Sequence, residues 1–178
     1  MNPIPHTLIR SNRKSISIQI TAQGVVVRAP RAATDSQVEH YVQSKRSWIE
    51  SHLAKLPEPQ PKFTRAEVEE LARKALAVIP ERVRHYAPIV GVRYGNITIR
   101  NQRSRWGSCS SKGNLNFNCL LMLTPAHVID YVVVHELCHR LELNHSPRFW
   151  SHLERVLPNY RQSAQWLKEH EKELIWRL

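Results

Sequence analysis

The chain has few cysteines and no long hydrophobic segment. Its three cysteines, Cys109, Cys119 and Cys138, are odd in number and form no CxxC pair, which argues against a disulfide framework and a zinc ribbon. No apolar run approaches the length of a membrane span, and the N-terminus lacks the hydrophobic core of a signal peptide. Internal repeats and low-complexity tracts are also missing. We therefore expect a cytoplasmic protein with no membrane partner.

Acidic residues are in short supply as well. The 178 residues include 26 Lys and Arg but only 15 Asp and Glu, which gives a formal net charge of +11 and a pI of about 10.1. A protein surface with this excess of positive charge favours nucleic acid, ribosomes or acidic proteins as partners. The basic residues are scattered, however, with no compact basic run and no nucleic-acid-binding motif. Binding of DNA or another polyanion stays open beside the alternative of a solvated basic surface.

The first part of the chain predicts a β-hairpin followed by a helix. Residues 15–20 alternate polar and apolar side chains, Gln23-Gly24 is a turn signal, and residues 25–27 form a second strand. A single helix is expected from about residue 34 to about residue 56, and the proline-rich residues 57–61 predict a stiff linker. We expect an N-terminal hairpin and helix over residues 1–60, packed on a catalytic domain over residues 61–178.

The second part predicts an α+β domain with a small antiparallel sheet. Thr64 and Glu67 form a capping-box pattern at the start of a helix that ends near Tyr86, with a kink at Pro80. A strand-rich stretch follows, and Thr124-Pro125 starts the next helix. The expected strands lie at residues 97–100, 106–110 and 115–118, and the last two helices at residues 147–156 and 160–173.

The helix that begins at Pro125 carries the motif His135-Glu136-Leu137-Cys138-His139. Histidines four residues apart lie on one face of a helix, so both imidazoles can reach one metal ion, with Glu136 beside it. The apolar residues 131–134 lead into the motif, and buried polar groups need a partner such as a metal. The alternative is a surface helix that carries these residues by chance. Cys138 shares its helical direction with apolar residues, which favours core packing.

His145 is the candidate third ligand, because a catalytic zinc site has three protein ligands and a water. Asn144 favours a left-handed end to the motif helix, and Ser146-Pro147 predicts the N-cap and first residue of the next helix. His145 would then lie on a tight corner from which it can turn back toward the metal. The alternative is that it only packs against the corner. The all-histidine set favours one zinc per chain, although nickel or cobalt would also bind.

These residues point to a metal-dependent hydrolase, with a peptidase as the leading candidate. Glu136 would act as general base, taking a proton from a zinc-activated water that attacks the carbonyl of a protein or peptide substrate. Trp106 could line the cleft, although tryptophan in this setting is more often a core residue. Several further side chains are candidates for contact with the substrate or its oxyanion, and the alternative for each is a role in surface charge or helix packing. The candidates for contact with the substrate or its oxyanion are Arg103, Arg105, Asn118, His152 and Tyr160.

The stretch from residue 105 to residue 150 resembles the YgjP-like family of zinc-dependent metallopeptidases and, more distantly, the SprT/Spartan-like proteases. The residues that carry the resemblance are the blocks 105–110, 131–132, 135–139, 144–146 and 149–150, with Gly113, Asn118, Leu120 and Pro125. The resemblance implies a zincin-like α+β domain with His135, His139 and His145 as zinc ligands and Glu136 as catalytic base. In zincin-like folds the strand before the motif helix, here residues 115–118, forms the rim of the cleft. A peptide could add to that strand unless it is internal to the sheet.

Two other functions remain open from the sequence. The first is a non-enzymatic basic module, in which a structural zinc site accompanies a surface for nucleic acid or ribosomes. Glu136 argues against it, because a structural site has no use for a carboxylate beside the metal and usually has a fourth protein ligand. The second is an amidase that acts on a small molecule. The SprT/Spartan-like proteases act on proteins crosslinked to DNA, and the basic chain is compatible with that by analogy.

Overall fold

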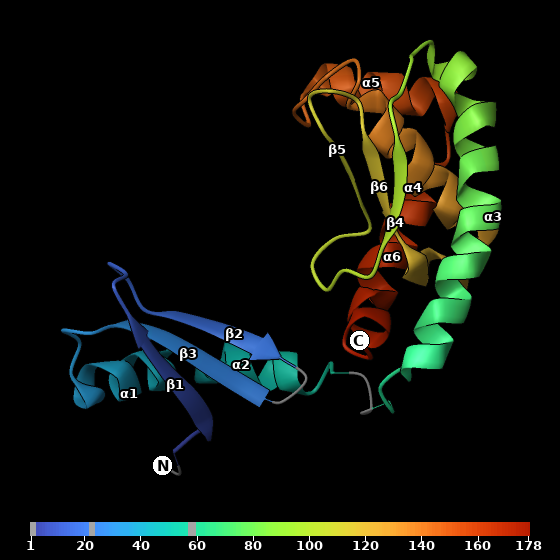
Figure 1. The fold of residues 1–178 in the computed structure, drawn as a ribbon. Coiled ribbons are helices and arrows are strands. Elements are labelled where there is room, and N and C mark those ends of the chain that lie inside the picture. The colour runs from blue at the N-terminus through green and yellow to red at the C-terminus, as the bar shows by residue number, and fades with distance from the viewer. Residues whose placement is uncertain (1–2, 22–23, 57–59) are drawn as a thin grey trace. The chain divides into compact units, whose positions relative to one another are not determined.

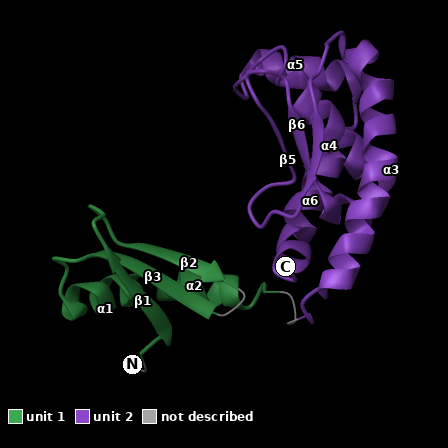
Figure 2. Cartoon of the chain, in the orientation of Figure 1, with its two compact units in different colours: residues 1–59 green, residues 60–178 purple. Residues whose placement is uncertain are grey.

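The computed structural model describes residues 3–21, 24–56 and 60–178. The chain divides into two compact units, an N-terminal unit up to residue 59 and a C-terminal unit from residue 60, which Figure 2 shows in green and purple. Residues 57–59 of the predicted linker lie outside the described residues. None of the described helices is long and apolar enough to cross a membrane.

The N-terminal unit is a three-stranded sheet that shares one core with two helices. Strand β3 lies in the centre, antiparallel to β2 and parallel to β1. The predicted hairpin of β2 and β3 is confirmed, although Gln23 of its turn lies outside the described residues, and β1 was not among the predicted strands. The elements are β1 (His6–Ser11), β2 (Ser17–Thr21), β3 (Gly24–Pro30), α1 (Asp35–Ser44) and α2 (Arg46–Leu53).

The prediction of one helix up to residue 56 is wrong, because the helix breaks at Lys45. Its backbone angles, φ −105° and ψ 11°, are not helical, and its N–H donates to carbonyls of the last turn of α1. Lys45 is a charged residue on a face that is otherwise apolar. The break leaves Lys45 exposed while Val42 of α1 and Ile49 of α2 are fully buried in the same core. Burying an unpaired ammonium group would have cost more than the lost helical hydrogen bonds.

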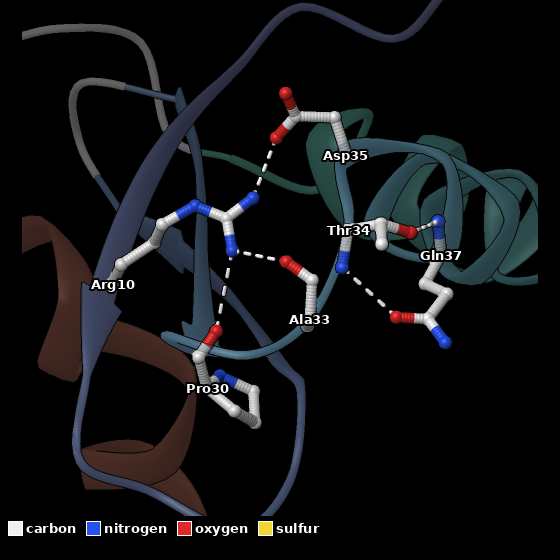
Figure 3. A network of polar contacts seen from close by, with 6 residues as sticks. All are labelled: Arg10, Pro30, Ala33, Thr34, Asp35 and Gln37. Atoms are coloured by element: carbon white, nitrogen blue, oxygen red, sulfur yellow. Dashed lines mark hydrogen bonds and ion pairs between the residues drawn. The ribbon is translucent and has the colours of Figure 1, made fainter.

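Figure 3 shows how the loop between β3 and α1 is held. The Arg10 guanidinium donates to the carbonyl of Pro30 at 3.2 Å, to the carbonyl of Ala33, and to the carboxylate of Asp35 at 2.5 Å. At the start of α1, the Thr34 hydroxyl accepts from the Gln37 N–H at 3.2 Å, and the Gln37 side chain accepts from the Thr34 N–H at 2.9 Å. This capping box satisfies two backbone donors and fixes where α1 begins.

The C-terminal unit combines a second three-stranded sheet with helices, so the expected mixture of helices and small sheets is confirmed. Helix α4 contacts α3, α5, α6, the short 3-10 helix η1 and strand β5, so it lies at the centre of the unit (Figure 1). The elements are α3 (Arg65–Val90), β4 (Ile97–Arg100), β5 (Gly107–Cys109), β6 (Leu115–Asn118), η1 (Cys119–Leu123), α4 (Ala126–Cys138), α5 (Pro147–Val156) and α6 (Tyr160–Ile175).

Helix α3 begins as predicted but continues about one turn further. The capping box of Thr64 and Glu67 is present. The helix runs through Pro80, whose missing N–H costs a hydrogen bond to the carbonyl of Leu76. Leu76 is 57% exposed, so water can reach that side of the helix. The buried positions continue beyond Pro80, and the helix ends only at Gly91, whose φ of 86° is a left-handed C-cap.

Strand order bears on the expected sheet and on the expected rim of the cleft. β6 lies between β4, to which it is parallel, and β5, to which it is antiparallel, so the sheet is mixed and the expectation of an antiparallel sheet is wrong. Since β6 is central, residues 115–118 have no free edge, so the alternative of an internal strand is the one observed. The edge strands of this sheet are β4 and β5, and Figure 1 shows β5 on the outer side.

Candidate metal centre

Helix α4 and the segment after it bring three histidines together. His135 lies in the last turn of α4, His139 is its C-cap residue, and His145 directly precedes Ser146, the N-cap of α5. Their candidate ligand atoms all lie within 4.8 Å of one another. His135 and His139 are half-buried and His145 is exposed. The three histidines therefore form one cluster, which we call the histidine triad.

The chain turns toward His145 in a different way from the one expected. No described residue other than glycine has a positive φ, so the prediction of a left-handed Asn144 is wrong. His139 caps the helix with ordinary right-handed angles, φ −64° and ψ −11°. Asn144 acts through its side chain instead, because its Oδ1 accepts from the N–H of Ser146 at 3.1 Å. This short-range turn, with the predicted N-cap Ser146, sets the position of His145.

The ring nitrogens of the triad suit a metal ion. His139 Nδ1 lies 3.1 Å from the backbone carbonyl of Glu142, which can only accept, so this nitrogen carries the proton and Nε2 keeps its lone pair. The Nε2 atoms of His135 and His145 are 3.0 Å apart. Two lone pairs facing each other need a cation or a proton between them. Two nitrogens bound to tetrahedral zinc at 2.0–2.1 Å are roughly 3.3 Å apart, which is close to the observed separation.

The environments of His135 and His139 favour neutral imidazoles. Burial, together with the neighbouring His139 and His145, lowers the pKa of His135 to about 3. Burial also lowers the pKa of His139. Metal ligation requires a free lone pair, so histidines that resist protonation are ready ligands at neutral pH. The donor set, the separation of its atoms and its charge state all fit a zinc ion.

Glu136 is the one buried carboxylate beside the triad among the described residues. It is 5% exposed, and its Oε2 is buried without a hydrogen-bond partner. Burial raises the pKa of its carboxyl group to about 8, while the positive charge of Arg105 acts in the opposite direction. An ionised carboxylate at this position therefore needs further positive charge close to it.

Gly107 of β5 lies directly against Glu136. A Cβ atom at position 107 would be 2.6 Å from Glu136 Oε1 and 2.7 Å from its Cγ, which is too close for any side chain. The absence of a side chain thus lets the strand backbone fix the carboxylate. Gly107 belongs to the block of residues 105–110 that carries the family resemblance, but the sequence analysis assigned it no role. A glycine inside a strand often marks a place where another group approaches the backbone closely, and this was the signal available in the sequence.

Aromatic side chains form a wall around the triad. The ring of Phe149 is fully buried and lies 4.7–4.8 Å from all three imidazoles, measured between centroids. Trp150 stacks on His145 at 5.7 Å, and Tyr131 meets His135 edge-on at 5.8 Å. Tyr160 stacks on both Trp150 and Tyr131, at 5.6 and 6.3 Å. Phe149 and Trp150 carry no titratable group, so sequence reasoning gave them no role at the site.

The candidate substrate contacts divide into different roles. Asn118 is fully buried, and its amide nitrogen donates to the carbonyls of Gln102 and Arg105 at 2.6 and 3.1 Å. Both of its hydrogens are thus used, so Asn118 has no free N–H to donate to a substrate. Instead, Asn118 holds the loop that carries the two candidate arginines. Arg105 is exposed, and its charge acts on Glu136.

The remaining candidates lie further from the chemistry. Tyr160 is buried in the aromatic wall described above. Arg103 is exposed on the loop that Asn118 holds. His152 is half-buried on α5, and no described ring contact joins it to the triad.

A cavity of about 210 Å³ lies against His135 and Glu136, and we call it the apolar pocket. Its other walls are Trp106, Gly107, Tyr131, Val132 and Leu167. The expectation that Trp106 lines the cleft agrees with this, and Trp106 also packs against the hydrophobic core. The pocket therefore joins strand β5, helix α4 and helix α6 beside the buried carboxylate.

The open edge of β5 is formed by the backbone groups of two residues. Trp106 accepts from the N–H of Asn118 at 2.8 Å, and Ser110 donates to the carbonyl of Asn114 at 2.9 Å, so both are turned toward β6. Backbone groups alternate in direction along an antiparallel strand. The N–H and C=O groups of Gly107 and Cys109 therefore point toward the open edge.

A family model described as YgjP-like, metallopeptidase domain, matches residues 14–71 and 57–170. Among solved structures, the metallopeptidase zymogen abylysin of Pyrococcus abyssi matches with 20% identity and a TM-score of 0.48, over 53% of this chain and 97% of that one. The zymogen jannalysin of Methanocaldococcus jannaschii matches with 21% identity and a TM-score of 0.45, over 53% and 96%. No curated protein matches the chain.

Proposed function

The chain belongs to the YgjP-like metallopeptidase family, and we propose that it hydrolyses peptide bonds with one zinc ion held by the histidine triad. The ligands in this proposal are His135, His139 and His145, and the general base is Glu136. The observation that carries the proposal is the convergence of three imidazoles beside a buried carboxylate. We assign catalysis to the domain of residues 61–178, which contains all four residues.

Each functional residue has its own role in the proposed reaction. A zinc ion held by three imidazoles supplies a Lewis acid and lowers the pKa of its water toward ~7. Glu136 accepts a proton from the attacking water and passes it to the leaving amine. Burial alone would keep Glu136 protonated, and the positive charge of Arg105 and of the metal favours the carboxylate.

Strand β5 supports a peptide as the substrate. An extended chain can pair with the outward-facing backbone groups of Gly107 and Cys109 by β-addition. Gly107 also contacts Glu136, so a peptide on this edge passes next to the general base. Among the candidates for oxyanion contact, Arg105 has the best support, because its charge already reaches Glu136.

The alternative of a basic binding module with a structural zinc has less support. A structural zinc site usually has four protein ligands, and the group found among the described residues has three. The carboxylate of Glu136 would also have no purpose there. The net charge of +11 keeps binding of DNA or another polyanion open as a property of the peptidase.

The test is the metal content of the wild-type protein and of Glu136→Gln by elemental mass spectrometry, with both assayed on an unfolded protein. We expect one zinc per chain in both and a loss of about 10²–10⁴-fold in kcat for the variant, the usual contribution of a general base. Glu154→Gln, an exposed carboxylate on α5, is the matched control and should keep full activity.

Each other outcome has a meaning. A wild-type protein without metal would refute the proposal, and zinc in both proteins with no cleavage by either would favour the binding module. An assay with and without DNA addresses the polyanion. A higher rate of cleavage with DNA would support substrates held near nucleic acid.

A further inference from the structure

We propose that the apolar pocket is a specificity pocket, which accepts one apolar side chain of the peptide substrate next to the bond that is cleaved. The inference rests on the proposed peptidase function and names the class of substrate for the same site. It predicts a preference for leucine, methionine, isoleucine or phenylalanine at one of the two positions that flank the cleaved bond.

The walls of the pocket are apolar and well packed. Val132 is 3% exposed, Leu167 is 8% exposed and Tyr131 is 9% exposed, and all three belong to the hydrophobic core of the C-terminal unit. They come from two helices, α4 and α6, so the wall does not depend on a single loop. A wall made by core residues keeps its shape, and a pocket of fixed shape can discriminate between side chains.

The size of the pocket fits one side chain. Its volume of about 210 Å³ lies below the range of roughly 300–1,000 Å³ that is usual for sites of small-molecule ligands. A charged or amide side chain would lose most of its hydration there. An acidic side chain would also meet the carboxylate of Glu136. An apolar side chain gains most from the transfer, because it leaves water for walls of the same kind.

The position of the pocket connects it with the cleaved bond. Gly107 and Glu136 both line it, and Gly107 is also one of the two residues of β5 whose backbone groups face the open edge. Side chains of an extended peptide alternate between two directions. A peptide paired with β5 therefore directs one side chain toward α4 and into the pocket while its backbone lies beside Glu136.

The first experiment reads the cleavage sites that the zinc-loaded protein makes in a mixture of random peptides, by mass spectrometry. We expect leucine and similar residues to be enriched at one flanking position. Leu167→Phe fills the pocket and should lower cleavage at leucine relative to alanine by about 100-fold, the scale set by a few methylene groups in an apolar pocket. Leu167→Ala should instead shift the preference toward phenylalanine and tryptophan.

Leu174 offers a matched control. It lies two turns further along α6 and is 9% exposed, against 8% for Leu167, but it does not line the pocket. Leu174→Phe and Leu174→Ala should keep the cleavage preference of the wild type. A preference for charged or small residues, or a leucine preference that both Leu167 variants retain, would overturn the pocket while the peptidase proposal stands.

A second measurement does not depend on turnover. N-acetyl-leucinamide is titrated into zinc-loaded Glu136→Gln, and NMR follows the Gly107 amide and the Leu167 methyl groups. We expect saturable shifts, at least tenfold weaker binding of N-acetyl-asparaginamide, and loss of the Gly107 shift when Leu167→Phe is added. Saturable shifts without cleavage of any peptide would refute the peptidase and keep the pocket. Absence of saturable shifts would overturn the pocket whatever the activity.

Discussion

The site formed by the histidine triad and Glu136 has two halves that are built in different ways. Helix α4 supplies His135 and Glu136 from a segment in which Val134 and Leu137 are fully buried. His145 comes from the exposed stretch between α4 and α5, where one hydrogen bond from the Ser146 N–H to the Asn144 side chain forms the turn. Core packing thus fixes the first half, whereas local turn chemistry fixes the second.

This difference separates the roles of the residues in the proposed mechanism. The general base lies in the rigid half, where a displaced carboxylate would be most damaging to catalysis. The exposed half contributes a ligand but little to the core. Changes in the loop should therefore affect metal binding without affecting the fold, and changes around Glu136 should affect catalysis without affecting metal binding.

The largest expected effect comes from removing the exposed ligand. His145→Ala should weaken zinc binding by more than ~100-fold, because loss of a ligand exceeds the 10–100-fold typical of residues that only support ligands. The melting temperature of the metal-free protein should stay unchanged, since His145 is exposed. Competition with a chromophoric chelator measures the affinity, and calorimetry measures the melting temperature.

His152→Ala is the control for that experiment, because His152 is a nearby histidine outside the triad. It should bind zinc as the wild type does. Equal loss of zinc from both variants would show that the triad is not the metal site. A lower melting temperature of metal-free His145→Ala would show that the loop contributes to the fold after all.

The next effect concerns the rigid half. Gly107→Ala places a methyl group where Glu136 now lies, so the carboxylate must move. A displacement of about 1 Å can cost on the order of 100-fold in rate, and we expect a fall of this size in kcat with zinc content unchanged. Steady-state kinetics and elemental analysis check it, with Ser108→Ala on the same strand as control. A rise in KM alone would mean that Gly107 serves substrate pairing and does not position Glu136.

The rigid half was also the more predictable from sequence. His135, Glu136 and His139 follow from the helical repeat, which acts over four residues and needs no knowledge of the rest of the chain. Local signals also gave the capping box at Thr64 and the N-cap at Ser146, and the structure contains both. Features that depend only on residues close together in the sequence could therefore be predicted from the sequence.

Features that depend on distant parts of the chain could not be predicted. The central position of β6 is set by pairing with β4 and β5, and pairing partners are not encoded in the strand itself. The contact of Gly107 with Glu136 joins residues on different elements, and the apolar pocket needs Leu167 of α6. Even the turn at Asn144 was predicted with the wrong backbone, because asparagine can act either by a left-handed conformation or by its side chain.

The smallest expected effect measures the burial of Glu136 directly. Its pKa is raised from 4.5 to about 8 in the folded protein, so the folded state binds the proton more tightly than the unfolded state. The resulting stability is complete below pH 4.5 and is lost as the pH rises through about 8. Metal-free wild-type protein should therefore lose up to ~1.4 kcal/mol of unfolding free energy per pH unit in this window, relative to Glu136→Gln.

Urea denaturation of both metal-free proteins at several pH values measures this difference. The control variant Glu154→Gln should show no such pH-dependent difference from the wild type. The contribution of His135 is present in both proteins and cancels. A stability difference between the two proteins that stays constant from pH 4.5 to about 8 would mean that the chain itself, through Arg105, already holds the carboxylate ionised. The metal would then be needed only to activate water. A loss as expected would mean that the metal also supplies the charge that makes Glu136 a base, which would couple the two halves of the site.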